Sequence, residues 1–355
     1  MPRKHFIDNL RSMSVLVVAF YHVFYLLNSA GVITNIGVAG IPPLDVFCYF
    51  IYPWIMTFMF LLAGISARYS LESRGGRAFW RERVRKLVIP FFAGIFIIGW
   101  VNGWITDLSL DMFGGQGAMI PGPVKYVIYV TNIGVLWFLP QLIVCSLALT
   151  ILRAIDRQGR LLALGARANL PAALLLFIPV WGSSYVGNIP IVTVFRLGIY
   201  ILVFLLGYCV FSHEGVLARL ERAALPLAIC AVCAGVGVTW VFYGRSFSDG
   251  AFLQSPLVNA YQWLMCAALL GLGRRHMGGS GPVSMFLRAR SFPFYVLHYI
   301  VLLLMAYPLT HIAAWPMAGV YATLLVGVYP VTFALAEILR RIPLLRFLLF
   351  GIGKA

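Results

Sequence analysis

The stretch 291–336, SFPFYVLHYIVLLLMAYPLTHIAAWPMAGVYATLLVGVYPVTFALA, runs for 46 residues without a single Asp, Glu, Lys or Arg. An α-helix rises 1.5 Å per residue and needs about 20 apolar residues to cross the ~30 Å hydrocarbon core of a bilayer. The stretch is therefore long enough for two crossings. Pro308 and Pro316 lie near its middle, where they interrupt a helix. We predict transmembrane helices over 291–308 and 317–337.

The rest of the chain repeats this pattern in shorter form. Eight further charge-free stretches precede residue 291, each long enough for a helix that crosses a membrane. They predict eight more spans, at 12–31, 47–67, 87–106, 133–152, 170–187, 196–212, 224–243 and 257–273. The predicted fold class is an all-α integral membrane protein, a bundle of about ten transmembrane helices that forms a single domain over 1–355.

Composition and charge support a membrane protein. Hydrophobic residues make up 61% of the chain and charged residues 11%, whereas an ordinary soluble domain has about 45–50% apolar and about 25% charged residues. The net charge of +16 could suggest a nucleic-acid partner. However, in the ten-helix arrangement 24 of the 27 Lys and Arg fall on the side that carries both termini. Positive residues mark the cytoplasmic side of a membrane protein, so we expect cytoplasmic termini and no nucleic-acid binding.

Histidines inside the predicted spans are candidates for chemistry, because an ionisable group within a membrane is costly. His22 follows Arg11 by eleven residues, which places it ~16 Å deeper, near the bilayer midplane. This depth suits a group that acts between the two faces, and the alternative is a histidine satisfied by a neighbouring carbonyl. His298 shares one side of its helix with Tyr295 and Ser291, three and seven residues earlier. That stripe either binds a polar part of a substrate or links helices by hydrogen bonds.

Two sets of basic residues are also candidates. The segment 74–90, RGGRAFWRERVRKLVIP, predicts a helix at the membrane surface. On it Arg77, Arg81 and Arg85 form one cationic stripe, with Arg83 and Lys86 nearby. The stripe binds either anionic lipid headgroups or a phosphate-rich cytoplasmic cofactor, since guanidinium groups pair well with phosphate. Arg196, at a helix end on the outer side, either snorkels to the surface or contacts an anionic or sugar substrate.

The longest predicted outer loop spans 107–132. It contains Asp107, Asp111, Lys125 and several glycines. Loops of this length often have a function of their own. A re-entrant apolar piece around 118–130 is an equally good interpretation.

Five segments, taken in order, point to one family. They are Asp8-Asn-Leu-Arg11 followed by ten residues and His22, Phe60-Leu-Leu-Ala-Gly64, the basic run from Arg81 to Pro90, Leu136-Trp-Phe-Leu139, and Ser291-Phe-Pro-Phe-Tyr-Val-Leu-His298. Together they resemble the signatures of the acyltransferase 3 family, integral-membrane enzymes that O-acylate extracytoplasmic polysaccharides, glucans and lipid-linked sugars. Ser12 and Ala63 depart from the family's usual Gly and Ser, which affects helix packing rather than a proposed catalytic group.

The resemblance implies a reaction and roles for particular residues. An acetyl or other short acyl group would pass from cytoplasmic acyl-coenzyme A to a hydroxyl of an extracytoplasmic glycan or glycolipid, in the inner membrane of a bacterium and without a metal. His22 would be the general base, with Arg11 and His298 as further catalytic residues. Donor binding would fall to Arg77, Arg81, Arg83, Arg85 and Lys86, and substrate binding to Asp8, Trp137, Arg196, Ser291 and Tyr295.

A secondary transporter or flippase for a glycolipid or sugar is the main alternative function. It would share the number of spans and the polar groups near the midplane. Two features weigh against it, since the predicted spans carry no carboxylate for ion coupling and the chain has no visible internal repeat. A structural membrane scaffold is a third interpretation, and it gives no reason for His22 and His298 to face the bundle.

Overall fold

Helices build nearly all of the protein that the computed structural model describes, which is residues 4–187 and 196–353. No β-strand occurs within those two ranges. The chain folds as two compact units, each made of segments that are distant in the sequence. The prediction of an all-α protein is confirmed, whereas a single domain over 1–355 remains a prediction.

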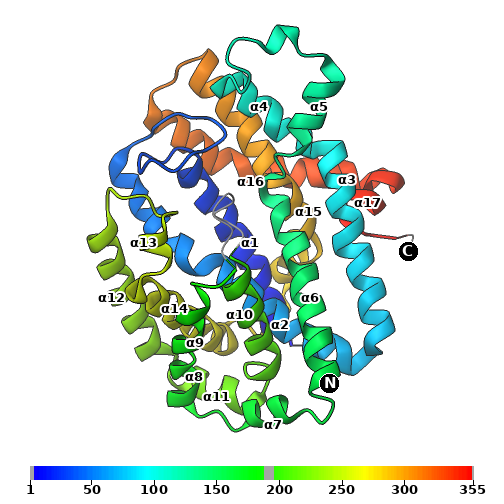
Figure 1. The fold of residues 1–355 in the computed structure, drawn as a ribbon, viewed down its shortest axis with the longest axis vertical. Helices are drawn as coiled ribbons and strands as arrows, with labels where there is room; N and C mark the ends of the chain where they lie inside the picture. The colour runs from blue at the N-terminus through cyan, green and yellow to red at the C-terminus, as the bar shows by residue number, and fades with distance from the viewer. Residues whose placement is uncertain (1–3, 188–195, 354–355) are drawn as a thin grey trace. The chain divides into compact units, whose positions relative to one another are not determined.

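The first unit consists of Met1–Ser14, Tyr49–Arg81 and Gln141–Arg288. Within it α12 and α14 pack side by side, and α11 also packs on α14 (Figure 1). Its helices are the first part of α1 (His5–Leu26), most of α2 (Val46–Arg83) and of α6 (Phe138–Ile155), then α7 (Arg160–Ala166), α8 (Leu170–Leu175), α9 (Phe177–Ser183), α10 (Leu197–Cys209), α11 (Glu214–Arg222), α12 (Ala224–Phe242), α13 (Gly250–Leu253), α14 (Pro256–His276) and the start of α15 (Pro282–Tyr307).

The second unit consists of Val15–Cys48, Glu82–Pro140 and Ala289–Ala355. Within it α4 packs on α5 and α3 packs on α17 (Figure 1). Besides the remainders of α1, α2, α6 and α15, it contains η1 (Pro42–Asp45), η2 (Val84–Val88), α3 (Ile89–Gly94), η3 (Ile95–Gly99), α4 (Trp100–Leu110), η4 (Gly117–Met119), α5 (Gly122–Val130), η5 (Gly134–Trp137), η6 (Pro308–Ile312), α16 (Met317–Arg341) and α17 (Pro343–Phe350).

Six helical segments of the described chain are long and apolar enough to cross a membrane. They are His5–Leu26, Pro42–Leu110, Gly134–Ile155, Ala224–Phe242, Pro282–Ile312 and Met317–Arg341. A seventh arises if α10 and α11, bent by 103° at their junction, are taken as one span. These segments confirm a membrane protein, but the predicted count of ten is not confirmed.

The difference in count has local causes. Helix runs on without a loop through Pro42–Leu110, which covers two of the predicted spans. The span predicted at 170–187 is divided into the short helices α8 and α9. The span predicted at 257–273 is present as α14, which ends in Arg274, Arg275 and His276 and is not among the six. The charge-free stretches therefore predicted where helices lie, but they did not predict how neighbouring helices are connected.

Helix α1 begins seven residues earlier than its predicted start at residue 12. An ion pair stabilises the early turns, since Arg11 Nη2 lies 3.0 Å from Asp8 Oδ1 one turn before it. Asp8 in the first turn also interacts favourably with the positive end of the helix dipole. After the helix ends, the Asn28 side chain donates hydrogen bonds to the Tyr25 and Val32 carbonyls at 2.8 and 3.0 Å.

The basic segment 74–90 is helical beyond Gly75, a residue with non-helical dihedrals that separates the two helices sharing the label α2. The φ of 75° at this kink is accessible to glycine at little cost. From Val84 the backbone makes the π-helical turn η2. Because a π-helical turn holds more residues than an α-helical one, Arg85 does not continue the even spacing of Arg77 and Arg81.

Gly64, the last residue of the Phe60–Gly64 segment, marks a close approach of α2 and α10. A Cβ atom at Gly64 would lie 2.0 Å from the carbonyl oxygen of Phe204 on α10. On the opposite helix, a Cβ at Gly207 would lie 2.4 Å from the carbonyl oxygen of Leu61. Both glycines are needed because only a residue without a side chain lets two backbones meet this closely.

We therefore expect Gly64→Ala to destabilise the first unit. The added methyl group has backbone rather than a flexible side chain in its way, and overpacking of this kind typically costs about 1–3 kcal/mol or more. Thermal melting of the purified protein in detergent measures the effect. The matched control is Gly237→Ala on α12, where nothing lies within 4 Å of the new Cβ. Equal melting temperatures for the two variants would contradict the prediction.

Candidate functional site

His22 and His298 meet inside the second unit. Nδ1 of His22 on α1 lies 3.0 Å from Nε2 of His298 on α15, and their ring centroids are 5.1 Å apart. They are 276 positions apart in the sequence. Two histidines that the sequence marked independently therefore form one hydrogen-bonded pair.

The protonation of this pair follows from the second partner of His298. Its Nδ1 lies 2.7 Å from the backbone carbonyl oxygen of Tyr295. A carbonyl oxygen only accepts hydrogen bonds, so Nδ1 of His298 carries the proton, and in a neutral imidazole Nε2 is then an acceptor. His22 must donate to it from Nδ1. A neutral His22 is thereby left with a lone pair on its Nε2.

The two rings differ in accessibility. His298 is fully buried, with none of its surface exposed, whereas His22 is half-buried. His298 uses both ring nitrogens within the protein, whereas the pair uses one ring nitrogen of His22, whose ring also interacts with the Val18 backbone. The geometry thus leaves Nε2 of the more exposed ring, His22, outside the hydrogen bond that joins the pair.

The surroundings of His298 join two of the segments singled out in the sequence. The Tyr295 hydroxyl donates a hydrogen bond to the Val135 carbonyl, next to the Leu136–Leu139 segment. The ring of Phe138 in that segment meets Tyr295 edge-on, at 5.7 Å between centroids. Trp137 is buried beside them, with 8% of its surface exposed. Since the Tyr295 hydroxyl already has an acceptor, its contacts favour the helix-linking role over direct substrate binding.

Tyr299 and three polar residues extend this region, and the sequence reasoning missed all four. The Tyr299 ring lies 5.0 Å from the His22 ring between centroids. Its hydroxyl donates to Asn35 Oδ1 at 2.6 Å, and Asn35 Nδ2 donates to Thr106 Oγ1, also at 2.6 Å. Asn132 Nδ2 reaches the same hydroxyl at 3.2 Å. The available signal was that these polar residues stand at the predicted outer ends of spans, where a substrate pocket would open.

The predicted loop 107–132 is partly helical in the second unit, because it contains α5. The Tyr129 hydroxyl donates to Asp107 Oδ2 at 2.6 Å, which ties α5 to the end of α4. Burial, reinforced by the Asp107 hydrogen bond and charge, raises the pKa of Tyr129 to about 12. Tyr129 is therefore a neutral hydrogen-bond donor at physiological pH, and its role here is structural.

The predicted basic site residues are divided between the two units, with Arg11, Arg77 and Arg81 in the first. Arg11 is partly exposed and paired with Asp8. Arg77 and Arg81 are exposed on α2. In the second unit Arg85 and Lys86 are exposed, and Lys86 Nζ lies 2.6 Å from Glu82 Oε1. The donor-site assignment of these residues stays a prediction.

The position of Arg196 rules out snorkelling, one of the two roles suggested for it by the sequence. It is buried, with 3% of its surface exposed, so it does not snorkel to the surface. Nη2 of Arg196 donates to the Leu253 carbonyl at 3.1 Å, and Asn259 Nδ2 donates to the same oxygen at 3.0 Å. The guanidinium thus helps to hold the end of α13 against α14. Its role as a substrate contact remains a prediction.

The remaining candidate is Ser291, which is half-buried one turn before Tyr295 on α15. His311, another histidine of the stretch 291–336, lies exposed in the π-helical turn η6, stacked on Tyr307 at 5.0 Å between ring centroids. In the described ranges no three His, Cys, Asp or Glu side chains come together as a metal site would require. A reaction without metal stays a prediction.

Comparison with known proteins gives one match. The sequence model of a family described as an acyltransferase domain matches residues 4–337, nearly the whole chain. No curated protein and no solved structure matches significantly. The matched range contains all five segments noted in the sequence, including both histidines of the pair.

Proposed function

Because the chain belongs to this family of membrane acyltransferases, we propose that it moves an acetyl or other short acyl group from cytoplasmic acyl-coenzyme A to a hydroxyl of an extracytoplasmic glycan, glucan or lipid-linked sugar. The observation that carries the proposal is the His22–His298 pair, in which hydrogen bonding leaves the lone pair on Nε2 of the half-buried His22. We place the protein in the inner membrane of a bacterium, with the acceptor on the outer side.

The pair supports a direct transfer. His22 Nε2 takes the proton of the acceptor hydroxyl while its oxygen attacks the thioester carbonyl carbon. The tetrahedral intermediate collapses, the carbon–sulfur bond breaks, and the proton on His22 passes to the leaving thiolate. The products are the O-acyl ester and free coenzyme A. The thioester is already activated, so positioning the two substrates and moving one proton is the main task of the protein.

The donor would be held at its phosphates. Arg77, Arg81, Arg85 and Lys86 are exposed, and guanidinium groups bind phosphate with paired hydrogen bonds. We assign Arg83 to the same site and Arg11 to the donor side of the reaction. Asp8, Trp137, Arg196 and Ser291 are proposed substrate residues on the basis of the family resemblance.

Release of free coenzyme A by the purified protein tests the proposal. With acetyl-coenzyme A and a panel of sugar and glycan hydroxyls, thiol release should depend on the acceptor, and mass spectrometry should find the acyl ester. A transporter or flippase would release no thiol with any acceptor. Comparison of envelope glycan acylation with and without the protein then identifies the natural acceptor.

Replacing the exposed arginines tests donor binding. The triple variant Arg77→Gln, Arg81→Gln, Arg85→Gln should raise KM for acetyl-coenzyme A by about tenfold or more, since each charged hydrogen bond contributes ~1.5–3 kcal/mol. KM for the acceptor should change little. The control is a triple variant of other exposed arginines, Arg157→Gln, Arg275→Gln, Arg341→Gln. Unchanged donor kinetics with altered membrane association would instead favour lipid binding.

Cysteine labelling tests the proposed orientation. A cysteine at Ser73, exposed near the end of α2, should react with an impermeant maleimide only after the cells are permeabilised. The background variant should carry Cys230→Ala and Cys233→Ala, because these two native cysteines are exposed. Labelling of Ser73→Cys in intact cells would place this segment outside and refute cytoplasmic termini.

A further inference from the structure

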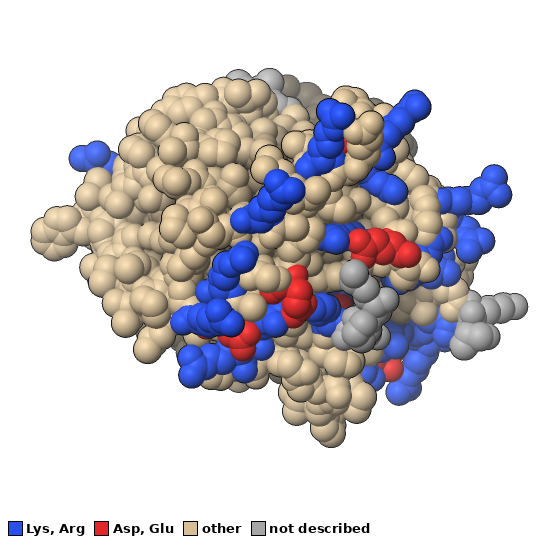
Figure 2. All heavy atoms as spheres, turned by 90° about the horizontal axis from the view of Figure 1, so that it is seen from below, with Lys and Arg blue, Asp and Glu red and all other residues tan. Residues whose placement is uncertain are grey.

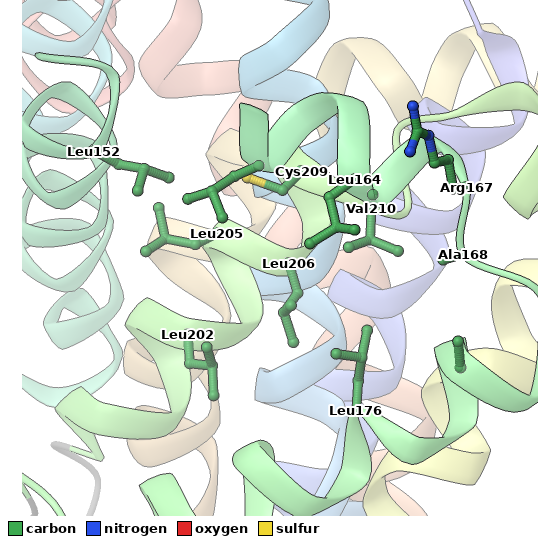
Figure 3. A pocket seen from close by; sticks show the side chains of 13 residues that line it. Leu152, Leu164, Arg167, Ala168, Leu176, Leu202, Leu205, Leu206, Cys209 and Val210 are labelled. Atoms are coloured by element: carbon green, nitrogen blue, oxygen red, sulfur yellow. The ribbon is translucent and has the colours of Figure 1, made fainter. Parts of the chain in front are cut away.

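A leucine-lined groove lies in the first unit, between α6, α7, α8 and α10 (Figure 3). It holds about 500 Å³ and is open on one side. Leu161 and Leu164 of α7 form one wall, and Leu202, Leu205 and Leu206 of α10 form another. Neither histidine of the pair lines the groove, and none of the chemistry proposed above uses it.

Close packing of α7 on α10 creates the groove. A Cβ at Gly165 would lie 1.9 Å from the Cys209 carbonyl oxygen, so the two backbones touch at this point. Leucines on either side of the contact cannot pack against each other across it. Leu161 and Leu164 remain 44% and 65% exposed. Apolar side chains on the α7 wall of the groove are therefore left uncovered by the protein.

Water is a poor occupant for such a surface. At ~30 Å³ for each molecule the groove would hold about 17 waters, with almost no polar group to bond them. An apolar occupant is favoured because it removes the leucine side chains from water. In a membrane protein the bilayer supplies such an occupant, the acyl chain of a lipid.

One end of the groove is positively charged. Arg167 is the charged side chain among the described lining residues, and in Figure 3 its guanidinium points away from the leucines. Arg219 Nη1 donates to the carbonyl of Ala168, another lining residue, at 2.8 Å. Two guanidinium groups therefore lie at the end formed by Arg167 and Ala168.

Nearby carboxylates are already engaged. Asp156 accepts hydrogen bonds at 2.8 Å from the backbone amides of Arg160 and Leu161, at the start of α7. Glu221 on α11 pairs with Arg274 at 2.7 Å. Over residues 153–222 of the first unit the sequence has seven Arg against one Asp and two Glu, and Figure 2 shows many more Lys and Arg than Asp and Glu on the face that it views. The local excess of positive charge favours an anionic headgroup.

We propose that this groove binds an anionic glycerophospholipid of the bilayer, with one acyl chain along the leucines and the phosphate at Arg167. The site would tie the α7–α8 region to the membrane. It does not depend on the proposed acyl transfer, so either inference can fail without the other.

Native mass spectrometry of the purified full-length protein tests the site. Titrated with dioleoyl phosphatidylglycerol and dioleoyl phosphatidylcholine, the protein should bind the anionic lipid more tightly. Arg167→Gln should weaken phosphatidylglycerol binding by about tenfold, as expected for one lost charged hydrogen bond, and weaken phosphatidylcholine binding less, because its choline already offsets the phosphate charge. Ala172→Trp, which places a large side chain in the groove from an exposed position, should abolish binding of both.

The controls make each outcome decisive. Arg157→Gln, at an exposed arginine outside the lining, should bind both lipids like the parent. In a Leu164→Cys variant that also carries Cys230→Ala and Cys233→Ala, phosphatidylglycerol should protect the new thiol on the exposed wall of the groove from alkylation. This readout does not require Ala172→Trp to fold. Equal affinity for the two lipids, no protection in the Leu164→Cys variant, or displacement of the lipid by oleoyl-coenzyme A would each overturn the proposal.

Discussion

Replacing His22 by alanine should reduce acyl transfer by about 100- to 10,000-fold, the usual range for loss of a general base. His22 is the half-buried member of the pair, and its Nε2 keeps a lone pair because Nδ1 donates to His298. Acetyl-coenzyme A binding should change little, because the proposed donor site binds the phosphates and does not include His22.

Turnover of acetyl-coenzyme A by the purified variant, with its melting temperature, measures the effect. His22→Ala should insert and melt much like the parent. His311→Ala is the matched control, since His311 is an exposed histidine outside the pair, and it should keep full activity. If a well-folded His22→Ala protein keeps more than about a tenth of the parental rate, a loss under ~1.4 kcal/mol, His22 is not the base. His298 would then be the next candidate.

The second large effect is expected at His298. His298→Phe removes the acceptor for His22 Nδ1–H but keeps a ring of similar size. His22 can then adopt the other tautomer, with the proton on Nε2, where it cannot act as a base. Loss of the residue that orients a catalytic histidine can lower the rate by about 100-fold or more. We therefore expect kcat to fall by about 100-fold in His298→Phe, with KM for both substrates little changed.

His298→Gln is the variant that separates orientation from packing. Its amide oxygen can accept the hydrogen bond from His22 near the position of the lost Nε2. We expect His298→Gln to recover at least tenfold of the activity lost in His298→Phe, although glutamine fits an apolar core less well than phenylalanine does. If the phenylalanine variant is as active as the parent, or the glutamine variant is no better than the phenylalanine variant, His298 does not set the tautomer of His22.

Several features of the fold followed from the sequence because they depend on local composition. The charge-free stretches located helices, since an apolar run in a membrane must satisfy its backbone hydrogen bonds within itself. The predicted count of separate crossings is not confirmed, and the joins between helices could not be predicted. The region Pro42–Leu110 is one helical stretch with a kink at Gly75, and 170–187 breaks at Leu176. Such joins depend on contacts with other helices, which no local pattern contains.

Some residues of the candidate site could be predicted from the sequence, and others were found only in the structure. His22 and His298 stood out in the sequence because an ionisable side chain within a span is rare and costly. Tyr299 and Asn35 did not stand out, because a tyrosine in an apolar run and an asparagine after a helix are ordinary. Only the fold showed that these two bond each other beside His22. Arg196, suggested by the sequence as a snorkelling residue, proved to be buried.

The sequence by itself determined that this is a helical membrane protein, which family it resembles, and which two histidines are candidates for chemistry. These properties depend on amino-acid composition and on motifs a few residues long. Only the tertiary structure decided that the histidines are partners and which nitrogen of each carries the proton. The physical reason is that a tautomer is set by a hydrogen-bond partner, and here the partners are the Tyr295 carbonyl and a ring 276 residues away. The distance between two such groups is fixed by how helices pack, and helix packing is a property of the whole folded unit.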